Sequence, residues 1–426
     1  MGQKEKNANT KAFFFLRHNN DIDHITPVLY KWLSTKKVHT DIIIISNKKF
    51  LNDYRINYLK KYDNVKIYLL SDHFNKFSLL YVFNSLYFKY TTEFDALIKK
   101  YSIIKKLAKR TFTKVAKKIF KDADNGIIVF DWITTFFVQH MVNFGKKNGF
   151  VTLSLPHGDR VYISQIDKLN DINYDTLKIY KPADIFDYVV VPNKMCSLRY
   201  VDFLDENKIK ILGSPRYSDK WLNIINKLIP KYELVQSDDK LKIVFFIRNT
   251  GFPIFWEEVI RAIQLIVQFP EVYLIVKHHP RNKIAKKLTK KLLNHNPQVA
   301  KSIDVNLKFI YEDVNSVSLI KWADVIIDLG TSVAWEPIKQ KKPVLMLEYV
   351  NANYAIISHY MEESEINCRD ELYEVLKKFI KDKNKPFYNE ASRRKFIKDI
   401  IDVSDKNTLD VYCDFLKKCL NESKNK

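Results

Sequence analysis

Short apolar runs alternate with segments of helical periodicity along most of the chain. The first half contains seven such runs, each bounded by polar or turn-forming residues: 12–16, 41–46, 65–70, 126–131, 150–156, 188–192 and 208–213. A polar turn over residues 17–23 follows the first run and leads into an amphipathic segment over residues 24–34. Short strands with helices between them predict a parallel sheet covered by helices on both faces.

This rhythm stops over residues 214–240 and then begins again. The second series has apolar runs at 241–247, 271–277, 308–311, 325–329 and 343–347, with helices expected at about 255–268, 282–293, 316–322 and 332–340. The rest of the chain is lysine-rich and shows only helical patterns. We therefore predict an α/β protein of two doubly wound Rossmann-like domains facing across a cleft, residues 1–235 and 236–370. A helical tail, residues 371–426, is expected to pack back on both.

Composition narrows the class of protein. With 46% hydrophobic and 14% aromatic residues the chain is expected to fold. Its apolar runs are far shorter than the roughly 18 residues of a membrane span. The first eleven residues lack the apolar core of a signal peptide, and the four cysteines lack metal-ligand spacing. A cytoplasmic protein with reduced thiols is predicted.

The formal net charge of +22 favours anionic partners. Residues 98–121 hold ten Lys or Arg and no acid, with apolar positions at helical spacing, which predicts a basic amphipathic helix. Such a helix is either a solvated cationic face over an ordinary core stripe or a contact with the anionic inner-membrane surface. We predict the membrane contact as a partner, a peripheral location at that membrane, and no nucleic-acid partner.

Glycine points to candidate binding loops, because the chain has only 8 glycines and four of them follow apolar runs. The sharpest case is residues 323–336, where a strand ends, Gly330 turns the chain, and Thr331 or Ser332 caps the next helix. Amides at a helix start attract phosphate. Glu336, one turn further on, offers a carboxylate to ribose hydroxyls. A nucleotide site is therefore predicted here.

Two other strand ends in the second half carry cationic groups. His278, His279 and Arg281 follow one strand, and Arg281 suits bidentate phosphate contact. Adjacent histidines on an extended chain project to opposite sides, so a shared zinc ion is not expected. Arg248 follows another strand, next to Gly251. Neither GxxxxGK[ST] nor GxGxxG occurs, which disfavours kinases, ATPases and ordinary dinucleotide dehydrogenases.

In the first half, polar residues that follow strands are candidates for proton transfer. His157 follows the run at 150–156, and Asp21, Asp23 and His24 follow the opening run. A carboxylate or imidazole at such a position can act as a general base. A helix cap for the two aspartates, or a structural hydrogen bond for His157, would explain the same residues.

Several of these motifs resemble bacterial surface-polysaccharide glycosyltransferases of the GT-B fold. The resemblance covers roughly residues 12–350 and rests on His279-Pro280, Gly330-Thr331-Ser332 with Glu336, Lys342-Pro343-Val344, and the stretches LGSPRY at 212–217 and LPHG at 155–158. The His-Pro and Ser/Thr pair is similar to the one that Kdo-type and polysialyl-type transferases use on the cytidine monophosphate part of their donors. The motif set is also similar to teichoic-acid glycerophosphotransferases, which use a cytidine diphosphate donor. Leu329-Gly330 stands where that second family has an aromatic-serine pair, so it ranks second.

The resemblance implies donor binding by His279, Arg281, Gly330, Thr331, Ser332 and Glu336. We accordingly predict a glycosyltransferase that moves a sugar from a nucleotide donor, CMP-linked by preference, to a growing capsule or lipopolysaccharide glycan. Asp23 or His157 would activate the acceptor hydroxyl, and Arg248 and Arg281 would supply positive charge without a metal. The alternatives are a CDP-glycerol-type glycerophosphotransferase, a sugar-nucleotide epimerase, and a non-catalytic basic protein that binds RNA or lipid.

Overall fold

The computed structural model describes residues 9–35, 37–45, 48–74, 79–131, 133–163, 181–235, 239–248, 253–279, 297–311 and 314–426. Its contacts divide the chain into two compact units. Unit 1 comprises Met1–Asp159, Thr176–Leu228 and Asp402–Lys426, and unit 2 comprises Arg160–Asp175 and Ile229–Ile401. The predicted domain limit at residues 235/236 falls inside unit 2. Residues 371–401 of the predicted tail belong to unit 2 and the rest to unit 1.

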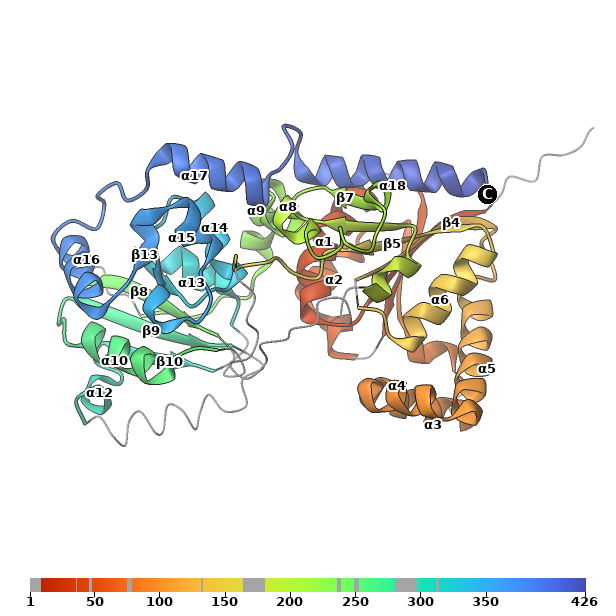
Figure 1. Ribbon diagram of the computed structural model, residues 1–426, viewed down its shortest axis with the longest axis horizontal. Coiled ribbons are helices and arrows are strands. Elements are labelled where there is room, and N and C mark those ends of the chain that lie inside the picture. The colour runs from red at the N-terminus through yellow and green to blue at the C-terminus, as the bar shows by residue number, and fades with distance from the viewer. Residues whose placement is uncertain are drawn as a thin grey trace, which may run out of the picture. The chain divides into compact units, whose positions relative to one another are not determined.

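Unit 1 is built on a parallel sheet of seven strands in the order β3-β2-β1-β4-β5-β6-β7 (Figure 1). The strands are β1 Thr10–Leu16, β2 His39–Ile44, β3 Val65–Leu69, β4 Asn125–Asp131, β5 Phe150–Leu155, β6 Tyr188–Val191 and β7 Ile209–Ile211. Its helices are α1 Asn19–Thr35, α2 Tyr54–Leu59, α3 Leu79–Lys89, α4 Thr91–Lys100, α5 Ser102–Ile119, α6 Phe136–Lys147, α8 Lys194–Ser197, α9 Asp219–Leu228 and α18 Thr408–Lys424. The strand order reverses beside β1, as in a doubly wound fold.

Alternate residues of the strands supply the two faces of this sheet. Phe13 and Phe15 of β1 belong to a core with α5 and α6, whereas Phe14 belongs to a second core with α1 and α18. A parallel strand covered on both faces is apolar throughout, which is why β1 appears in the sequence as an uninterrupted run. Tyr412 of α18 donates its hydroxyl proton to the carbonyl of Gly213 and fastens the last helix to the unit.

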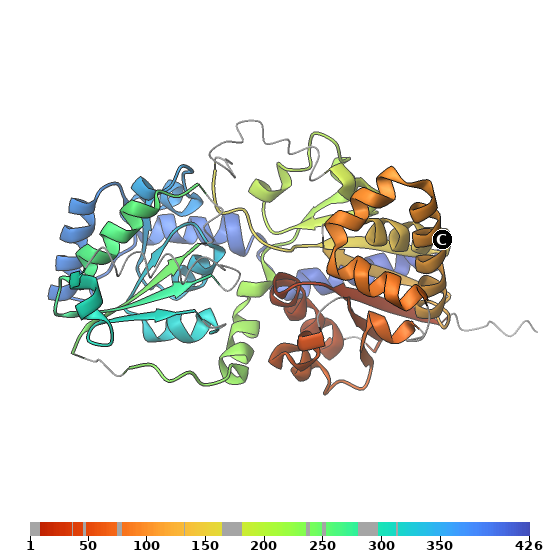
Figure 2. The same cartoon turned by 90° about the horizontal axis from the view of Figure 1, so that it is seen from below.

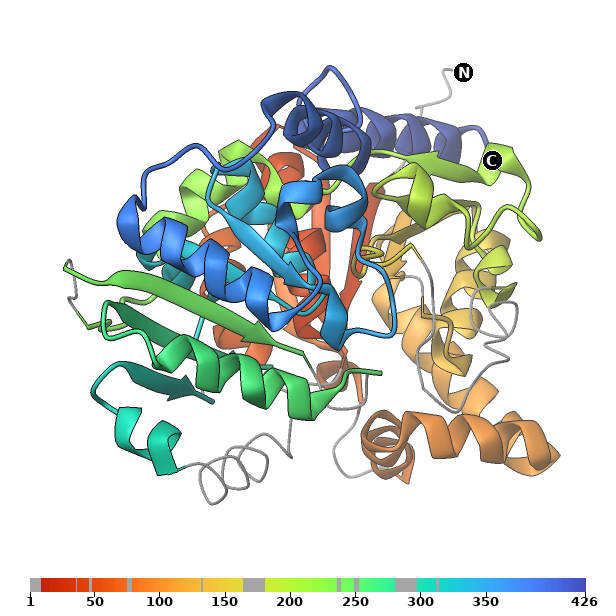
Figure 3. The ribbon, with the colours of Figure 1, turned by 60° about the vertical axis from the view of Figure 1, so that its left-hand side comes forward.

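Unit 2 repeats the plan with a six-stranded parallel sheet in the order β10-β9-β8-β11-β12-β13 (Figure 3). The strands are β8 Leu241–Ile247, β9 Val272–His278, β10 Leu307–Ile310, β11 Val325–Asp328, β12 Val344–Leu347 and β13 Glu365–Ile366. The helices are α10 Trp256–Val267, α12 Pro297–Ser302, α13 Ser316–Trp322, α14 Trp335–Lys339, α15 Ile356–Tyr360, α16 Arg369–Lys381 and α17 Glu390–Phe396. Helices α10 and α16 pack on one face of the sheet.

These two parallel-sheet units with a helical C-terminal region confirm the predicted fold class. None of the described helices combines the length and hydropathy that crossing a bilayer requires. Three predicted elements differ in detail. Helix α1 begins at Asn19, inside the predicted turn; the predicted basic helix is divided at Tyr101 into α4 and α5; and residues 332–340 form a short 3-10 turn, Ser332–Ala334, followed by α14. The helix predicted at 282–293 lies outside the described residues.

Candidate active site

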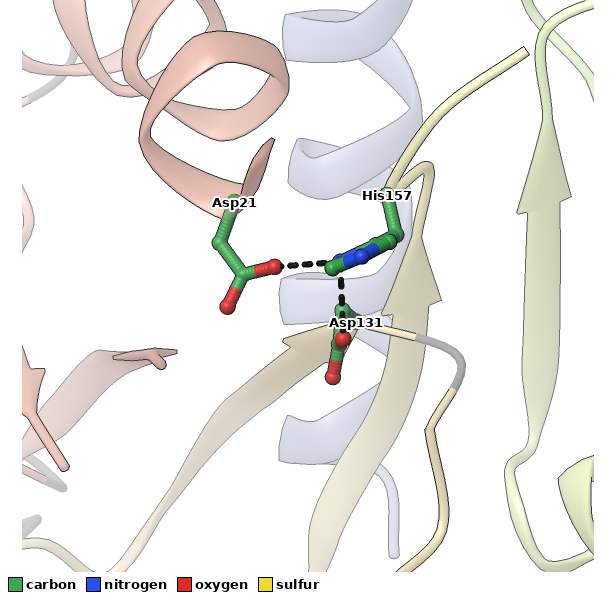
Figure 4. Close-up of side chains that lie close together, drawn as sticks. All are labelled: Asp21, Asp131 and His157. Atoms are coloured by element: carbon green, nitrogen blue, oxygen red, sulfur yellow. Dashed lines mark hydrogen bonds and ion pairs between the residues drawn. The ribbon is translucent and has the colours of Figure 1, made fainter. Parts of the chain in front are cut away.

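A cluster of charged side chains lies at the carboxyl ends of three neighbouring strands in unit 1. Arg17 follows β1 directly, Asp131 is the last residue of β4, and His157 comes two residues after β5. Asp21 joins them from the first turn of α1 (Figure 4). The strand order places β4 between β1 and β5, so the three strand ends are adjacent. Ligands of doubly wound sheets bind at this edge.

His157 is held by two carboxylates. Its Nδ1 donates to Oδ1 of Asp21 at 2.6 Å and lies 3.0 Å from Oδ2 of Asp131 (Figure 4). The side chains of Asp21 and Asp131 are 0% and 1% exposed, against 13% for His157. Nε2 of the ring lies 3.3 Å from Nδ2 of Asn20 and is the nitrogen that the two carboxylates do not hold.

The two carboxylates are fixed in turn by other donors. Both oxygens of Asp131 accept from Nη2 of Arg17. Oδ2 of Asp21 accepts from the backbone N–H groups of Arg17 and His18, at 2.6 and 3.1 Å. Donors of this kind fix a side chain at the start of a helix, so the local fold of the β1–α1 loop positions Asp21. The cluster is therefore a set of paired charges, in which each carboxylate has two sets of donors.

The electrostatics keep a proton on His157. Burial alone would lower its pKa, but the hydrogen bonds and negative charges of Asp131 and Asp21 outweigh burial and raise the pKa of His157 to about 9. For Asp131 burial acts in the opposite direction and would raise the pKa. The positive charges of Arg17 and His157 outweigh burial and hold the pKa of Asp131 below its ordinary value. At neutral pH the ring is an imidazolium, which can donate a proton or bind an anion through Nε2.

Asp21, Asp131 and His157 are also the one group among the described residues whose spacing could hold a metal ion, with ligand atoms all within 4.8 Å. The geometry favours protons instead. Nδ1 of His157 is at hydrogen-bond distance from both carboxylates, and the guanidinium of Arg17 contacts both oxygens of Asp131. A cation added here would face that guanidinium.

Asp23, the predicted base, has different neighbours from those of His157. It forms ion pairs with Arg55 and, at 3.6 Å, with Arg216. Burial raises the pKa of Asp23, but Arg216 and Arg55 outweigh it and keep the pKa below its usual value. The adjacent His24 is buried, and burial together with Arg216 lowers its pKa to about 3. The structure thus brings Asp21 into contact with His157, whereas Asp23 forms ion pairs with two arginines.

The edge of the second sheet contains the residues predicted to bind a nucleotide. The N–H of Thr331 donates to Oδ1 of Asp328 at 2.5 Å, and its hydroxyl donates to Oδ2 at 2.6 Å. Burial raises the pKa of Asp328 to about 6, against the opposing hydrogen bonds of Thr331. Nη1 of Arg248 donates to the carbonyl of Gly330 at 2.8 Å, and its guanidinium lies over the ring of Tyr162. These groups already have partners within the unit, and their role toward a nucleotide stays a prediction.

Gly330 has a conformation and a neighbour that only glycine accommodates. Its φ is +81°, and a Cβ built on it would lie 2.2 Å from the hydroxyl oxygen of Tyr162. That hydroxyl donates to the carbonyl of Leu329 at 2.7 Å, so the Tyr162 side chain is fixed by the same loop. The glycine noticed in the sequence is therefore required by close packing of Tyr162.

Replacing Gly330 with alanine is expected to lower the free energy of unfolding by about 2 to 3 kcal/mol, because both φ and the Tyr162 ring oppose a Cβ. Gly158→Ala is the matched control: a Cβ there meets nothing within 4 Å, and a change below about 0.5 kcal/mol is expected. Urea denaturation of both variants measures the difference. Equal stability of the two variants would contradict the packing argument.

The other described residues of unit 2 that were predicted to bind the donor are buried or partly buried. His278 is buried, stacks on Tyr311 with ring centroids 4.8 Å apart, and has its pKa lowered to about 4 by burial and by Lys277. His279 follows it at the end of β9 and is partly buried. Glu336 is buried, and its Oε1 accepts from Nε2 of Gln340 at 3.1 Å. Ser332 begins the 3-10 turn. Arg281 and Pro280 lie outside the described residues.

Arg17 and Asp131 were not among the predicted site residues, and the predicted base was Asp23, not Asp21. Two signals were available. Arg17 and Asp131 are charged residues at the very ends of apolar strands, where a doubly wound sheet places its ligands. The second signal is the charge itself, because a charged residue at the end of a buried strand needs a partner of opposite charge. Here the partners come from neighbouring strands.

The protein is thus a two-unit, doubly wound α/β protein with a buried acid–base cluster at the carboxyl edge of its first sheet. No protein-family profile matches the chain, and no curated protein does. Solved structures match it over nearly its whole length. A UDP-GlcNAc 2-epimerase from Neisseria meningitidis, bound to UDP-GlcNAc, is 11% identical with a TM-score of 0.54 and covers 97% of this chain and 100% of its own.

Two further structures show the same similarity. S. aureus MnaA with UDP is 13% identical with a TM-score of 0.59, over 97% of each chain. The UDP-GlcNAc 2-epimerase of Methanocaldococcus jannaschii is 15% identical with a TM-score of 0.52, over 91% of this chain and 99% of its own. At identities this low, the TM-scores establish a shared fold alone.

These matches correct the predicted activity. The prediction of a glycosyltransferase with a CMP-linked donor is wrong, because two of the similar structures are named as UDP-GlcNAc 2-epimerases, one of them bound to UDP-GlcNAc, and the third contains UDP. The names of the similar structures agree with the sugar-nucleotide epimerase that the sequence left as an alternative. The capsule and lipopolysaccharide acceptors have no support in these matches.

Proposed function

We propose that this protein epimerises a sugar carried on uridine diphosphate, with UDP-N-acetylglucosamine as the first substrate to test. The observation that carries the proposal is the cluster of Arg17, Asp21, Asp131 and His157 at the carboxyl edge of the first sheet. The similarity in fold to UDP-GlcNAc 2-epimerases over at least nine-tenths of the chain supports it.

Epimerisation needs proton transfer and no net co-reactant. The C2–H bond of the sugar breaks, its electron pair forms a double bond to C1, and the C1–O bond to UDP breaks. A proton added to the opposite face of C2 and the return of UDP to C1 then complete the inversion. An enzyme must therefore supply a group that accepts a proton and a group that donates one. His157, protonated at neutral pH and restrained through Nδ1, is the proposed donor through Nε2.

Asp21 and Arg17 are proposed as positioning residues for that donor. Asp21 fixes the ring by accepting from Nδ1, and Arg17 fixes Asp131 by donating to both of its oxygens. A buried ring that is held on one nitrogen by two carboxylates loses little freedom when the other nitrogen reacts. This arrangement would keep Nε2 in one orientation throughout the reaction.

For the nucleotide we propose the carboxyl edge of the second sheet. Arg248 and His279 follow neighbouring strands there, and Thr331 and Ser332 follow the strand on the other side of β8. Edges of doubly wound sheets bind nucleotides, and a guanidinium supplies charge for a diphosphate. The expected nucleotide is UDP.

Incubation with UDP-GlcNAc in D₂O tests the proposal. We expect the C2 epimer to appear in the proton NMR spectrum, with deuterium at the carbon that was inverted. His157→Asn should lose both signals. Unchanged substrate, or release of UDP without an epimer, would refute the proposed activity, and turnover of CMP-sugars alone would refute the proposed nucleotide.

A further inference from the structure

The helices α3, α4 and α5 of unit 1 expose an unusual number of apolar side chains. Among the described residues, fifteen large hydrophobic side chains are exposed, and seven of them lie within this one stretch of 26 residues. These seven are Val82, Leu86, Tyr90, Leu97, Tyr101, Ile103 and Leu107. Ile103 is 80% exposed, the highest fraction among the fifteen. Concentrated exposure of this kind marks a binding surface.

The pattern along α5 separates a core stripe from a solvent stripe. Ala108, Phe112 and Val115 are buried against the unit. Ile103 and Leu107 point away from that core, and the next residues on the same stripe, at spacings of three and four, are cationic: Arg110, Lys114 and Lys117. The solvent stripe is therefore apolar at the start of the helix and basic along the rest of it.

These helices form one supported element. The ring of Phe83 in α3 lies 5.7 Å from that of Phe94 in α4 and 6.4 Å from that of Phe112 in α5. Figures 1 and 3 show α3 and α4 side by side at one end of α5, and Figure 2 shows the three helices in front of the strands of unit 1. This aromatic packing holds the three helices together through their inner side chains.

The charge around these side chains is almost entirely positive. Residues 79–121 contain eleven Lys or Arg and two acids, Glu93 and Asp95. Asp95 is engaged by the hydroxyl of Tyr87 at 2.8 Å and by the N–H of Phe136. We call the seven exposed apolar side chains together with Arg110, Lys114 and Lys117 the apolar–basic face.

We propose that the apolar–basic face docks this protein on a bilayer that contains anionic phospholipid. Aliphatic side chains enter the acyl boundary, tyrosines suit the interface, and lysines on long stems reach the phosphates. A second copy of the chain would bring lysines against lysines. Nucleic acid would satisfy the lysines but leave Ile103 and Leu107 in water. This inference is independent of the proposed epimerase activity.

Sedimentation with vesicles tests it, using phosphatidylcholine alone and phosphatidylcholine mixed with phosphatidylglycerol. We expect the full chain to bind the mixed vesicles and not the neutral ones, and to dissociate as salt rises. The double variant Ile103→Asp/Leu107→Asp should weaken binding at least about tenfold, from lost apolar insertion and added negative charge. Neutralising Arg110, Lys114 and Lys117 with glutamine should weaken it by about fivefold per charge removed.

Leu198→Asp/Val201→Asp is the matched control, because both side chains are exposed apolar positions of unit 1 outside this face. The control should bind like the parent protein. Turnover of soluble UDP-GlcNAc should be the same in all three variants, so a failure of the proposed activity does not affect this test. The proposal would be overturned if the protein bound neutral vesicles equally well, or if the control variant lost binding as much as the double variant. It would also be overturned if the parent protein were a dimer that the double variant converts to a monomer, or if an RNA oligonucleotide displaced the protein from the vesicles.

Discussion

Replacement of His157 with asparagine is expected to lower kcat for UDP-GlcNAc epimerisation by about 10²- to 10⁴-fold, the usual contribution of a positioned acid or base. The ring is the group in the cluster whose second nitrogen faces away from the two carboxylates. KM should change less, since the proposed nucleotide contacts lie on the second sheet. NMR measurement of initial rates over a range of substrate concentrations gives both constants.

The pH profile adds a readout that a purely structural role would not produce. The donor needs its proton, and the pKa of His157 is raised to about 9 by Asp131 and Asp21 against the effect of burial. We therefore expect kcat to fall as the pH rises through about 9. His39→Asn, an exposed histidine at the start of β2, serves as the control and should keep the parent rate. A His157→Asn variant with the parent kcat would exclude His157 as the donor.

Replacement of Asp131 with asparagine is expected to lower the free energy of unfolding at neutral pH by about 3 to 5 kcal/mol. The substitution removes one charge from a buried group and leaves the guanidinium of Arg17 and the imidazolium of His157 without their shared partner. Asp122→Asn is the control, because that side chain is 61% exposed, pairs with Lys121 at 3.8 Å, and should cost less than about 1 kcal/mol. Urea denaturation compares the two.

The stability difference caused by Asp131→Asn should depend on pH at both ends. The pKa of His157 is higher in the folded protein, about 9 against an ordinary 6.5, so its stabilising pair is complete below pH 6.5 and is lost as the pH rises through 9. The pKa of Asp131 is lower in the folded protein than its ordinary 3.8, so its contribution is present above that value and is lost as the pH falls. The difference should therefore be largest from about pH 4 to pH 6.5 and should decline as the pH rises from there toward 9. A cost that does not vary with pH would contradict the ion-pair explanation.

The strands were predictable because burial imposes a simple pattern on them. Parallel strands covered on both faces are largely apolar, so residues 12–16 of β1, 127–130 of β4 and 243–247 of β8 appear as uninterrupted runs. β13, of only two residues, leaves no such run and was not predicted. The start of α1 was missed for another reason. Its first turn is polar, because Asp21 accepts hydrogen bonds from backbone N–H groups there, and that polarity resembles a loop.

Part of the candidate site was also predictable, and part was not. His157 could be selected as a polar residue after a strand, and the structure places it in the acid–base cluster. Asp21 and Asp23 are two residues apart on a helix and therefore point in different directions, so sequence alone could not say which of them reaches His157. Thr331 and Gly330 were noticed as loop residues, but their partners, Asp328 and Tyr162, depend on the fold.

By itself the sequence determined the alternation of strands and helices, the two parallel-sheet units, the helical C-terminal region and a strongly basic segment, because each follows from local periodicity or charge. Only the tertiary structure decided which charges meet. Arg17, Asp131 and His157 are separated by 114 and 26 positions along the chain, and they come together because β1, β4 and β5 are neighbours in one sheet. The order of strands in a sheet depends on nonlocal packing, which no local pattern records.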